Sequence, residues 1–262
     1  MMSGHIKITL AALLSSVAVS GTAYAQQPVT NRDIEHNFYV SGFVGAAFPG
    51  DASFSGEQNP PIGAPAGAGV IGAPAEIDVD FGTDVNFGGA VGYQLPFLLF
   101  GVFCPRLELE VNYFEAGVDS GSFNDGTQTF SGDLSNLSFF VNNLTDLIWK
   151  ENQVIVPYIG GGLGVAIIDA DIQYVGAAAP FAPLPAFVIS EDDVGFATHN
   201  ILGLSYLASD RLEVYAEGRY TRTYGIDFER RFVGGNTVDI FSADVSDTLD
   251  GFTATAGIRY RF

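Results

Sequence analysis

Charged residues of both signs recur at every second position in three segments of the chain. The segment RLELE begins at Arg106, RLEVYAEGR begins at Arg211, and GIRYRF ends at Phe262. Side chains alternate between the two faces of a β-strand, so these charges would share one face of each strand. That face would carry Arg106, Glu108, Glu110, Arg211, Glu213, Glu217, Arg219, Arg259 and Arg261. Four acids would meet five bases, and the chemistry that this pattern predicts is ion pairing.

Hydrolytic chemistry has few candidate residues. A protease or an acylhydrolase needs a histidine beside a serine or an aspartate, to activate a nucleophile or a water molecule. Of the three histidines, His5 lies near the N-terminus, His36 precedes the first predicted strand, and His199 lies in the sixth. The carboxylates that could join His199 are interpreted as ordinary loop charges: Asp78, Asp80, Asp169 and Asp171. We therefore predict no enzyme, no catalytic residue and no cofactor.

The N-terminal segment has the features of a secretory signal peptide. Lys7 precedes an apolar run at 8–19, and Ala23-Tyr24-Ala25 has the small-x-small pattern of a cleavage site. A membrane anchor is disfavoured because a spanning helix needs ~20 apolar residues. We expect cleavage between Ala25 and Gln26, which makes 1–25 a signal peptide and 26–36 a periplasmic tail.

Composition points away from nucleic acid and away from an ordinary soluble surface. Removal of Lys7 with the signal peptide leaves 10 Lys and Arg against 30 Asp and Glu, a formal charge of −20. Phosphate contacts need a basic surface, so nucleic-acid binding is disfavoured. Only 16% of the residues are charged and 47% are hydrophobic. The longest later apolar run, LPFLLFGVF at 95–103, is too short for a spanning helix, so strands remain the way to cross a membrane.

Eight segments alternate with period two, and most have the ~9–11 residues of a tilted spanning strand. They are 37–48, 84–95, 106–116, 134–144, 153–168, 195–207, 211–226 and 251–262. A soluble sandwich would also alternate, but the connections distinguish the two folds. Long connections (49–83, 117–133, 169–194, 227–250) alternate with short ones (96–105, 145–152, 208–210). Outer-membrane barrels have short periplasmic turns and long extracellular loops, so we predict an all-β, eight-stranded antiparallel up-and-down transmembrane β-barrel over 37–262.

Aromatic residues at the predicted strand ends support this placement. With both termini periplasmic, a periplasmic girdle would contain Phe38, Tyr93, Tyr206, Tyr260 and Phe262, with Trp149 in a turn. An outer girdle would contain Phe48, Tyr113 and Tyr220.

Several motifs resemble those of a known family. The last strand, with Phe252, Ile258, Tyr260 and Phe262, resembles the terminal signal by which bacterial outer-membrane barrels are handed to the barrel-assembly machinery. The segments NFYVSGFVGAAF, PYIGGGLGVA, LSYLASDRLEVYAEGRY and GIRYRF are similar to the small eight-stranded barrels of the opacity-like and porin-family surface antigens, related to the membrane domain of outer-membrane protein A. The resemblance covers 37–262. It implies the outer membrane of a Gram-negative bacterium, with lipid and lipopolysaccharide as surroundings.

The inside of the predicted barrel separates two functions. Inward positions on the second and fifth strands are small (Gly88, Ala90, Gly92, Gly160, Gly162, Gly164), which would leave room for long Arg and Glu side chains from across the barrel. An eight-stranded barrel is just wide enough for side chains to fill. We expect a largely plugged lumen and a structural or surface-interaction role. The alternative is a porin-like channel for small solutes.

The predicted outer loops are rich in Pro, Ala and Gly or in acids. The loops at 49–83 and 169–194 contain PPIGAPAGAGVIGAPA and GAAAPFAPLPAF, and they could contact an extracellular partner or be plain variable loops. Segments 49–83, 117–133, 169–194 and 228–250 hold 18 of the 30 acidic residues. These could collect divalent cations, but solvated charge is the preferred interpretation, so no metal site is predicted.

Overall fold

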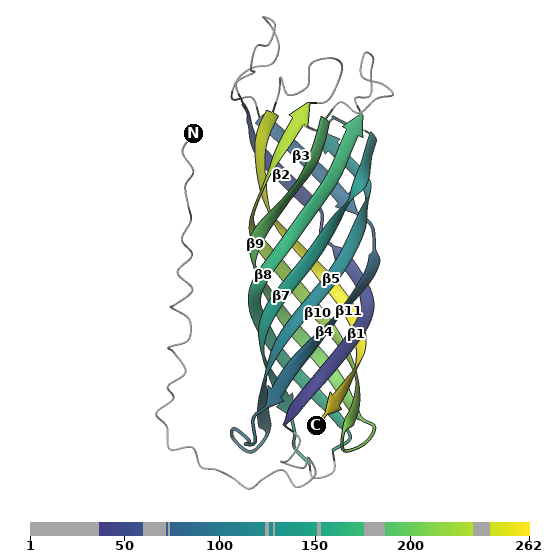
Figure 1. Ribbon diagram of the computed structural model, residues 1–262, viewed down its shortest axis with the longest axis vertical. Coiled ribbons are helices and arrows are strands. Elements are labelled where there is room, and N and C mark those ends of the chain that lie inside the picture. Colours follow the sequence, from purple (N-terminus) through teal and green to yellow (C-terminus); the bar gives the residue numbers. More distant parts are fainter. Residues whose placement is uncertain are drawn as a thin grey trace, which may run out of the picture.

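The computed structural model describes residues 37–59, 72, 74–123, 126–127, 129–150, 153–175, 187–232 and 242–262 (Figure 1). The predicted signal peptide and periplasmic tail, with Ala25, Gln26 and His36, lie outside these residues. No helix in the described residues is long and apolar enough to cross a membrane.

The described residues form a single antiparallel sheet that closes on itself. Eight strands make the ring, in the order β1-β4-β5-β7-β8-β9-β10-β11, and β11 pairs again with β1. The strands are β1 (Phe38–Pro49), β2 (Ala52–Gln58), β3 (Pro74–Phe81), β4 (Asp84–Gln94), β5 (Phe103–Phe123), β6 (Gly126–Thr127), β7 (Thr129–Leu147), β8 (Ile155–Val175), β9 (Phe187–Leu207), β10 (Leu212–Phe232) and β11 (Ser242–Arg261). The predicted eight-stranded up-and-down barrel is confirmed.

The strands extend further along the barrel, toward the end away from the C-terminus, than the sequence predicted. At the end that carries the C-terminus, which the sequence predicts to be periplasmic, the predicted boundaries are right to within about three residues. At the other end, β5, β7, β8, β9, β10 and β11 run into segments that were predicted as loops: 117–133, 169–194 and 227–250. The prediction was wrong there because it followed apolar residues on the outward face. In β8 the outward residues change from Val165 and Ile167 to Asp169 and Asp171, while Ile168 and Ile172 point inward.

The predicted loop 49–83 is also partly a strand pair. Ala47 pairs with Asp84 in β1 and β4, and Ala52 pairs with Val79 in β2 and β3, so one register runs through the break between them. β2 also pairs with β11, and β3 pairs with β5. This hairpin therefore continues the barrel wall beyond the breaks, at the end of the barrel away from the C-terminus (Figure 1).

The half of the barrel nearer the C-terminus has an apolar exterior. Its outward side chains are exposed and almost all apolar: for example Val40, Phe87, Leu109, Ile159 and Ile258 are 41–59% exposed. Such a continuous apolar band would be unfavourable in water, and it matches the lipid-facing surface of a transmembrane barrel. We call this part the membrane half.

Aromatic residues mark both edges of this band. Phe38, Tyr206, Tyr260 and Phe262 are exposed near the edge that carries the C-terminus, and Tyr93 lies against Phe38 with ring centroids 4.7 Å apart. Trp149 is exposed in the turn after β7. Phe48 and Tyr220 are exposed at the other edge, while Tyr113 is half-buried against Phe87, with centroids 5.4 Å apart.

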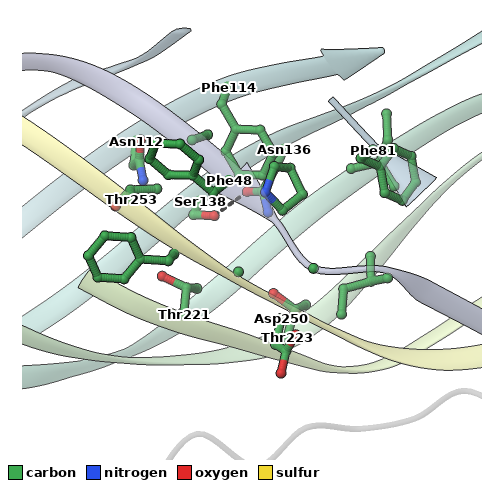
Figure 2. A pocket seen from close by; sticks show the side chains of 17 residues that line it. Phe48, Phe81, Asn112, Phe114, Asn136, Ser138, Thr221, Thr223, Asp250 and Thr253 are labelled. Carbon is green, nitrogen blue, oxygen red and sulfur yellow. Dashed lines mark hydrogen bonds between the residues drawn. The ribbon is translucent and has the colours of Figure 1, made fainter. Parts of the chain in front are cut away.

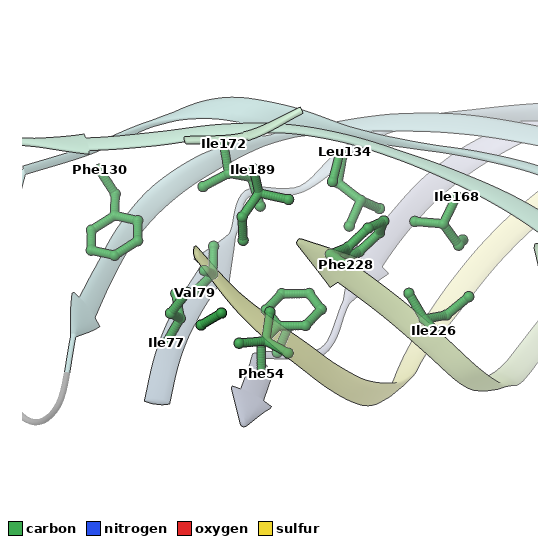
Figure 3. Packing of buried hydrophobic residues seen from close by; sticks show 14 of the residues in the cluster. Phe54, Ile77, Val79, Phe130, Leu134, Ile168, Ile172, Ile189, Ile226 and Phe228 are labelled. Atoms are coloured by element: carbon green, nitrogen blue, oxygen red, sulfur yellow. The ribbon is translucent and has the colours of Figure 1, made fainter. Parts of the chain in front are cut away.

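The other half, the outer half, reverses this arrangement. Its lumen is filled by apolar side chains from β2, β3, β7, β8, β9, β10 and β11 (Figure 3). Phe54 and Phe228 pack edge to face with centroids 5.6 Å apart, and Ile77, Ile168 and Ile172 are almost fully buried. Burying each such side chain contributes about 1.5–3 kcal/mol. The outer half therefore has the apolar core of a soluble protein, whereas the membrane half has an apolar exterior.

Candidate functional site

The lumen of the membrane half holds eight of the nine charged residues predicted to point inward. Arg106, Glu108, Glu110, Glu213, Glu217, Arg219, Arg259 and Arg261 are all at most 7% exposed. Arg211 is exposed instead, so its predicted inward orientation is wrong. The reason is local: β10 begins at Leu212, and Arg211 belongs to the turn that follows β9, where strand alternation does not apply.

Five of these residues form the part of the network nearest the C-terminal end of the barrel. Arg259 Nη1 lies 2.7 Å from Glu213 Oε2, and Arg259 Nη2 lies 3.6 Å from Glu108 Oε1. Arg261 Nη2 lies 2.6 Å from Glu213 Oε1, and Arg106 Nε lies 3.4 Å from Glu108 Oε1. Each of the two glutamates is therefore shared by two guanidinium groups.

A second part lies further along the lumen and has one cation. Arg219 forms ion pairs with both Glu110 and Glu217, and its Nε donates to Glu217 Oε1 at 2.8 Å. Asn142 Nδ2 donates to Glu110 Oε2 at 2.8 Å, and the Tyr158 hydroxyl donates to Glu217 Oε2 at 2.7 Å. Among the described residues no other Arg or Lys lies within 4 Å of these two carboxylates, so Arg219 is their only ion-pair partner there.

The sequence did not predict Asp146 as a member of this network. Its Oδ1 lies 2.9 Å from Arg106 Nη1, and its Oδ2 accepts from Gln94 Nε2 at 3.1 Å. Asp146 was assigned to the turn at 145–152, but β7 continues to Leu147 and keeps its alternation. With Asp146 added and Arg211 removed, the network holds five carboxylates and four guanidinium groups. We call these nine residues the lumen charge network.

Aromatic side chains occupy the space above the small inward residues. Tyr39 lies over Gly92, Phe43 over Gly88 and Tyr158 over Gly203, in each case the residue paired with it on the next strand. A Cβ atom at these glycines would overlap the ring. The prediction that the small residues make room for Arg and Glu from across the barrel is therefore wrong at Gly88 and Gly92. It is also wrong at Gly160, Gly162 and Gly164, where the neighbouring side chains are those of Leu144, His199 and Phe140. The guanidinium groups pack on the rings instead: Arg106 lies 4.4 Å from the Tyr158 centroid.

A small cavity lies where polar side chains in the lumen of the membrane half meet apolar side chains of the outer half, and Figure 2 shows the residues that line it. It measures about 40 Å³, and its lining is mostly apolar, with Phe81, Phe114 and Leu134 among the apolar residues. The polar residues of the lining include Asn112, Asn136, Ser138, Thr223 and Thr253. A buried water needs roughly 10–15 Å³ of such space, so the cavity has room for about three waters. Its lining also includes Phe48 and Phe252, which are exposed on the outside of the barrel, so the cavity reaches the wall near the break after β1.

A buried arginine lies among the aromatic residues of the outer half. Arg230 is fully buried, with its guanidinium 4.5 Å from the Phe187 centroid and 5.0 Å from the Phe123 centroid. Its Nη2 donates to Gln58 Oε1 at 3.4 Å. Tyr174 stacks on Phe187, with centroids 5.0 Å apart. The sequence placed Arg230 in a loop, whereas it points inward near the end of β10.

His199 lies in the lumen, away from the carboxylates considered with it. Its ring stacks on Phe140 with centroids 3.9 Å apart, and its Nε2 lies 2.8 Å from Asn142 Oδ1. Asp78, Asp80, Asp169 and Asp171 belong to the outward face of the outer half. Within the described ranges, no group of three or more His, Cys, Asp and Glu residues could hold a metal ion.

The outward face of the outer half is acidic and lies beyond the apolar band. Burial raises the pKa of Asp133, and the nearby carboxylates Glu115, Asp171 and Asp169 raise it further. Some carboxylates have local structural roles: Asp193 Oδ2 accepts from the Asp227 amide, and Glu191 Oε2 accepts from the Glu229 amide, both at 2.8 Å. These bonds lie where the regular pairing of β9 and β10 is interrupted.

Comparisons with known proteins find similar chains in several bacteria. A protein of Brucella suis biovar 1 is 25% identical over 199 residues, which is 68% of each chain. The crystal structure of the outer membrane protein OprG from Pseudomonas aeruginosa is 19% identical, covers 87% of this chain and 96% of its own, and gives a TM-score of 0.47. The outer membrane protease OmpT from Escherichia coli is 10% identical, with coverages of 86% and 97% and a TM-score of 0.47. These structural likenesses carry nothing about activity.

A family match covers most of the chain. The family model described as Surface antigen matches residues 75–262, which run from β3 to the end of β11 and include every member of the lumen charge network. The chain therefore belongs to the surface antigen family, and it is a β-barrel protein of the bacterial outer membrane.

Proposed function

We propose that this barrel has a structural or surface-interaction role and that its lumen is closed to solutes. The observation that carries the proposal is the presence of two different fillings along one lumen. The lumen charge network fills the membrane half, and the apolar core fills the outer half. A solute would have to displace paired charges and then an apolar core.

The charge pairing supports closure of the inner part. Charges that line an open aqueous channel are screened by water, and their pairs are worth little. Here the side chains are at most 7% exposed, and each guanidinium contacts a carboxylate. Such contacts are expected where water is excluded and the charges must satisfy one another.

The alternative function is a porin-like channel for small solutes. The cavity of about 40 Å³ is the observation that favours it, because it leaves a space in the barrel that is large enough for water. The cavity would conduct only if both fillings moved aside.

Conductance separates the two functions. We expect refolded wild-type protein in planar lipid bilayers to show no steady single-channel current above that of protein-free bilayers, because both fillings block ions. A known trimeric porin, refolded and inserted in the same way, is the positive control. Steady channels in most insertions of the wild-type barrel would overturn the closed-lumen proposal and favour the porin-like one.

No enzyme activity is part of the proposal. The residues that a hydrolase would need do not come together among the described side chains, since His199 faces Asn142 and Phe140 in the lumen. A surface-interaction role would instead use segments 49–83 and 169–194, whose described parts include β2 and β3 and the beginning of β9 in the outer half. Lipid, lipopolysaccharide and an extracellular partner are the proposed contacts.

The barrel-assembly machinery is a further proposed partner, and Phe262 tests it. Phe262 is 55% exposed and packs edge to face on Tyr260, with centroids 5.5 Å apart. Little of its area is buried, so Phe262→Ser should change the stability of refolded protein by less than about 1 kcal/mol. We expect a several-fold loss of folded barrel in the outer membrane, measured by heat-modifiable gel mobility. Phe38→Ser, at the same edge and 65% exposed, is the control. Equal losses for both variants would show that Phe262 is no special signal.

A further inference from the structure

The outward surface of the membrane half carries two exposed amides. Asn143 of β7 and Asn200 of β9 point away from the lumen, and each pairs in register with Gly161 of β8, which lies between them. On β1, β4, β5, β10 and β11 the outward positions of the same band hold only apolar, aromatic or glycine residues. The exposed amides are therefore confined to one side of the barrel. We call Asn143, Gly161 and Asn200 the amide face.

The amide face lies near the middle of the apolar band. The outward residues of β9 run from Val194 to Tyr206, and Asn200 is the central one. On β8 the outward apolar run from Ile155 to Ile167 is centred on Gly161. The hydrocarbon core offers no hydrogen-bonding groups, and neither amide side chain bonds to another described residue. An unsatisfied amide at this depth is unfavourable.

The wall is hollowed at this place. A groove of about 420 Å³ runs over the amide face, and its sides include Leu107, Val141 and Leu163. Gly161 has no side chain to fill it. A Cβ atom there would lie 2.7 Å from the carbonyl oxygen of His199 and 3.7 Å from Asn200 Oδ1. A partner in the membrane could therefore approach the backbone closely and reach both amides, as small residues permit at other membrane interfaces.

We propose that the amide face binds a second copy of this chain, in a dimer whose two-fold axis lies along the membrane normal near Asn200. An amide carries both a donor and an acceptor, so two identical amides can form two reciprocal hydrogen bonds. All copies of one barrel insert in the same direction, and a two-fold axis along the normal brings equivalent residues together at equal depth. Lipid tails could not hydrogen-bond to the amides, because they have no donors or acceptors.

Cysteine cross-linking in outer membranes tests the pairing. In a Cys104→Ser background, which removes the single native cysteine, Asn200→Cys is expected to give a product of twice the monomer mass with a short bis-maleimide. Val44→Cys on β1 is the matched control. It is also outward and 57% exposed, and β1 stands across the ring from β8. Cross-linking of Asn200→Cys no stronger than that of Val44→Cys, or only to a protein of another mass, would overturn the proposal.

Replacement of the amide by an apolar residue gives an independent measurement. Asn200→Leu should leave the barrel folded, as judged by heat-modifiable mobility, because an apolar side chain suits the lipid. The dimerisation constant should fall roughly tenfold, because each of the two membrane hydrogen bonds lost is worth about a factor of three. Dilution of wild type and variant in lipid vesicles measures this constant. A dimer of unchanged affinity in Asn200→Leu would contradict the proposal even if cross-linking succeeded.

Discussion

Arg219→Ala is expected to lower the free energy of unfolding by about 3–5 kcal/mol, because Arg219 is the one cation of the described residues that forms ion pairs with the buried carboxylates Glu110 and Glu217. Glu110 and Glu217 would keep their bonds from Asn142 and Tyr158 but would lose both ion pairs. A buried charge without a partner is strongly destabilising. The measurement is urea unfolding of refolded protein in lipid vesicles, followed by circular dichroism.

The neighbouring arginines supply matched controls. Arg211→Ala removes an exposed charge in the turn before β10 and should change stability by less than about 0.5 kcal/mol. Arg259→Ala should cost less than Arg219→Ala, because Glu213 keeps Arg261 and Glu108 keeps Arg106. A triple variant that also carries Glu110→Gln and Glu217→Gln should recover much of the loss, since no charge is left unpaired. No recovery would show that lost packing, and not unpaired charge, causes the effect.

Phe228→Ala should destabilise the barrel by about 3–5 kcal/mol through the cavity that it leaves in the outer half. Phe228 is 2% exposed and packs edge to face on Phe54. Phe196→Ala is the matched control, because Phe196 is 50% exposed on the lipid-facing side of β9. The same urea titration measures both variants. Equal losses would show that the apolar residues inside the outer half form no more of a core than those on the membrane surface.

The two fillings also act in series, and this predicts how conductance should respond. Neither Arg219→Ala nor Phe228→Ala alone should produce steady channels, because the other filling remains. The combined variant should conduct in a larger fraction of bilayer insertions than either parent. Channels in Arg219→Ala alone would show that the lumen charge network is the only barrier.

The sequence by itself determined the membrane half well. Period-two alternation follows from the geometry of a strand, and apolar residues must face lipid. These two constraints are local, so the number of strands, their periplasmic ends and the inward orientation of residues such as Glu108 and Glu213 could be predicted residue by residue. The inward orientation predicted for Arg211 was wrong because Arg211 lies in the turn, one residue before β10 begins, where alternation does not apply.

The strands of the outer half could not be predicted from local alternation and an apolar outward face alone. The alternation continues in β8 and its partners, but the apolar residues change to the inward face beyond the membrane. A prediction that requires apolar residues on the outward face therefore ends each strand where the apolar residues change to the inward face. The hairpin of β2 and β3 was not predicted, because its segments have the composition of loops. In the structure these segments pair with β11 and β5, and this pairing satisfies their backbone hydrogen-bonding groups.

Only the tertiary structure decided which inward residues meet. Arg219 contacts Glu110, which is 109 residues away in the sequence, and Tyr39 contacts Glu108, 69 residues away. These contacts depend on the order of strands around the ring and on their stagger, which closure of the barrel fixes as a whole. The sequence therefore determined that the charges point inward, and ring closure determined their partners, because an inward orientation is a property of one strand whereas a partner is a property of the whole barrel.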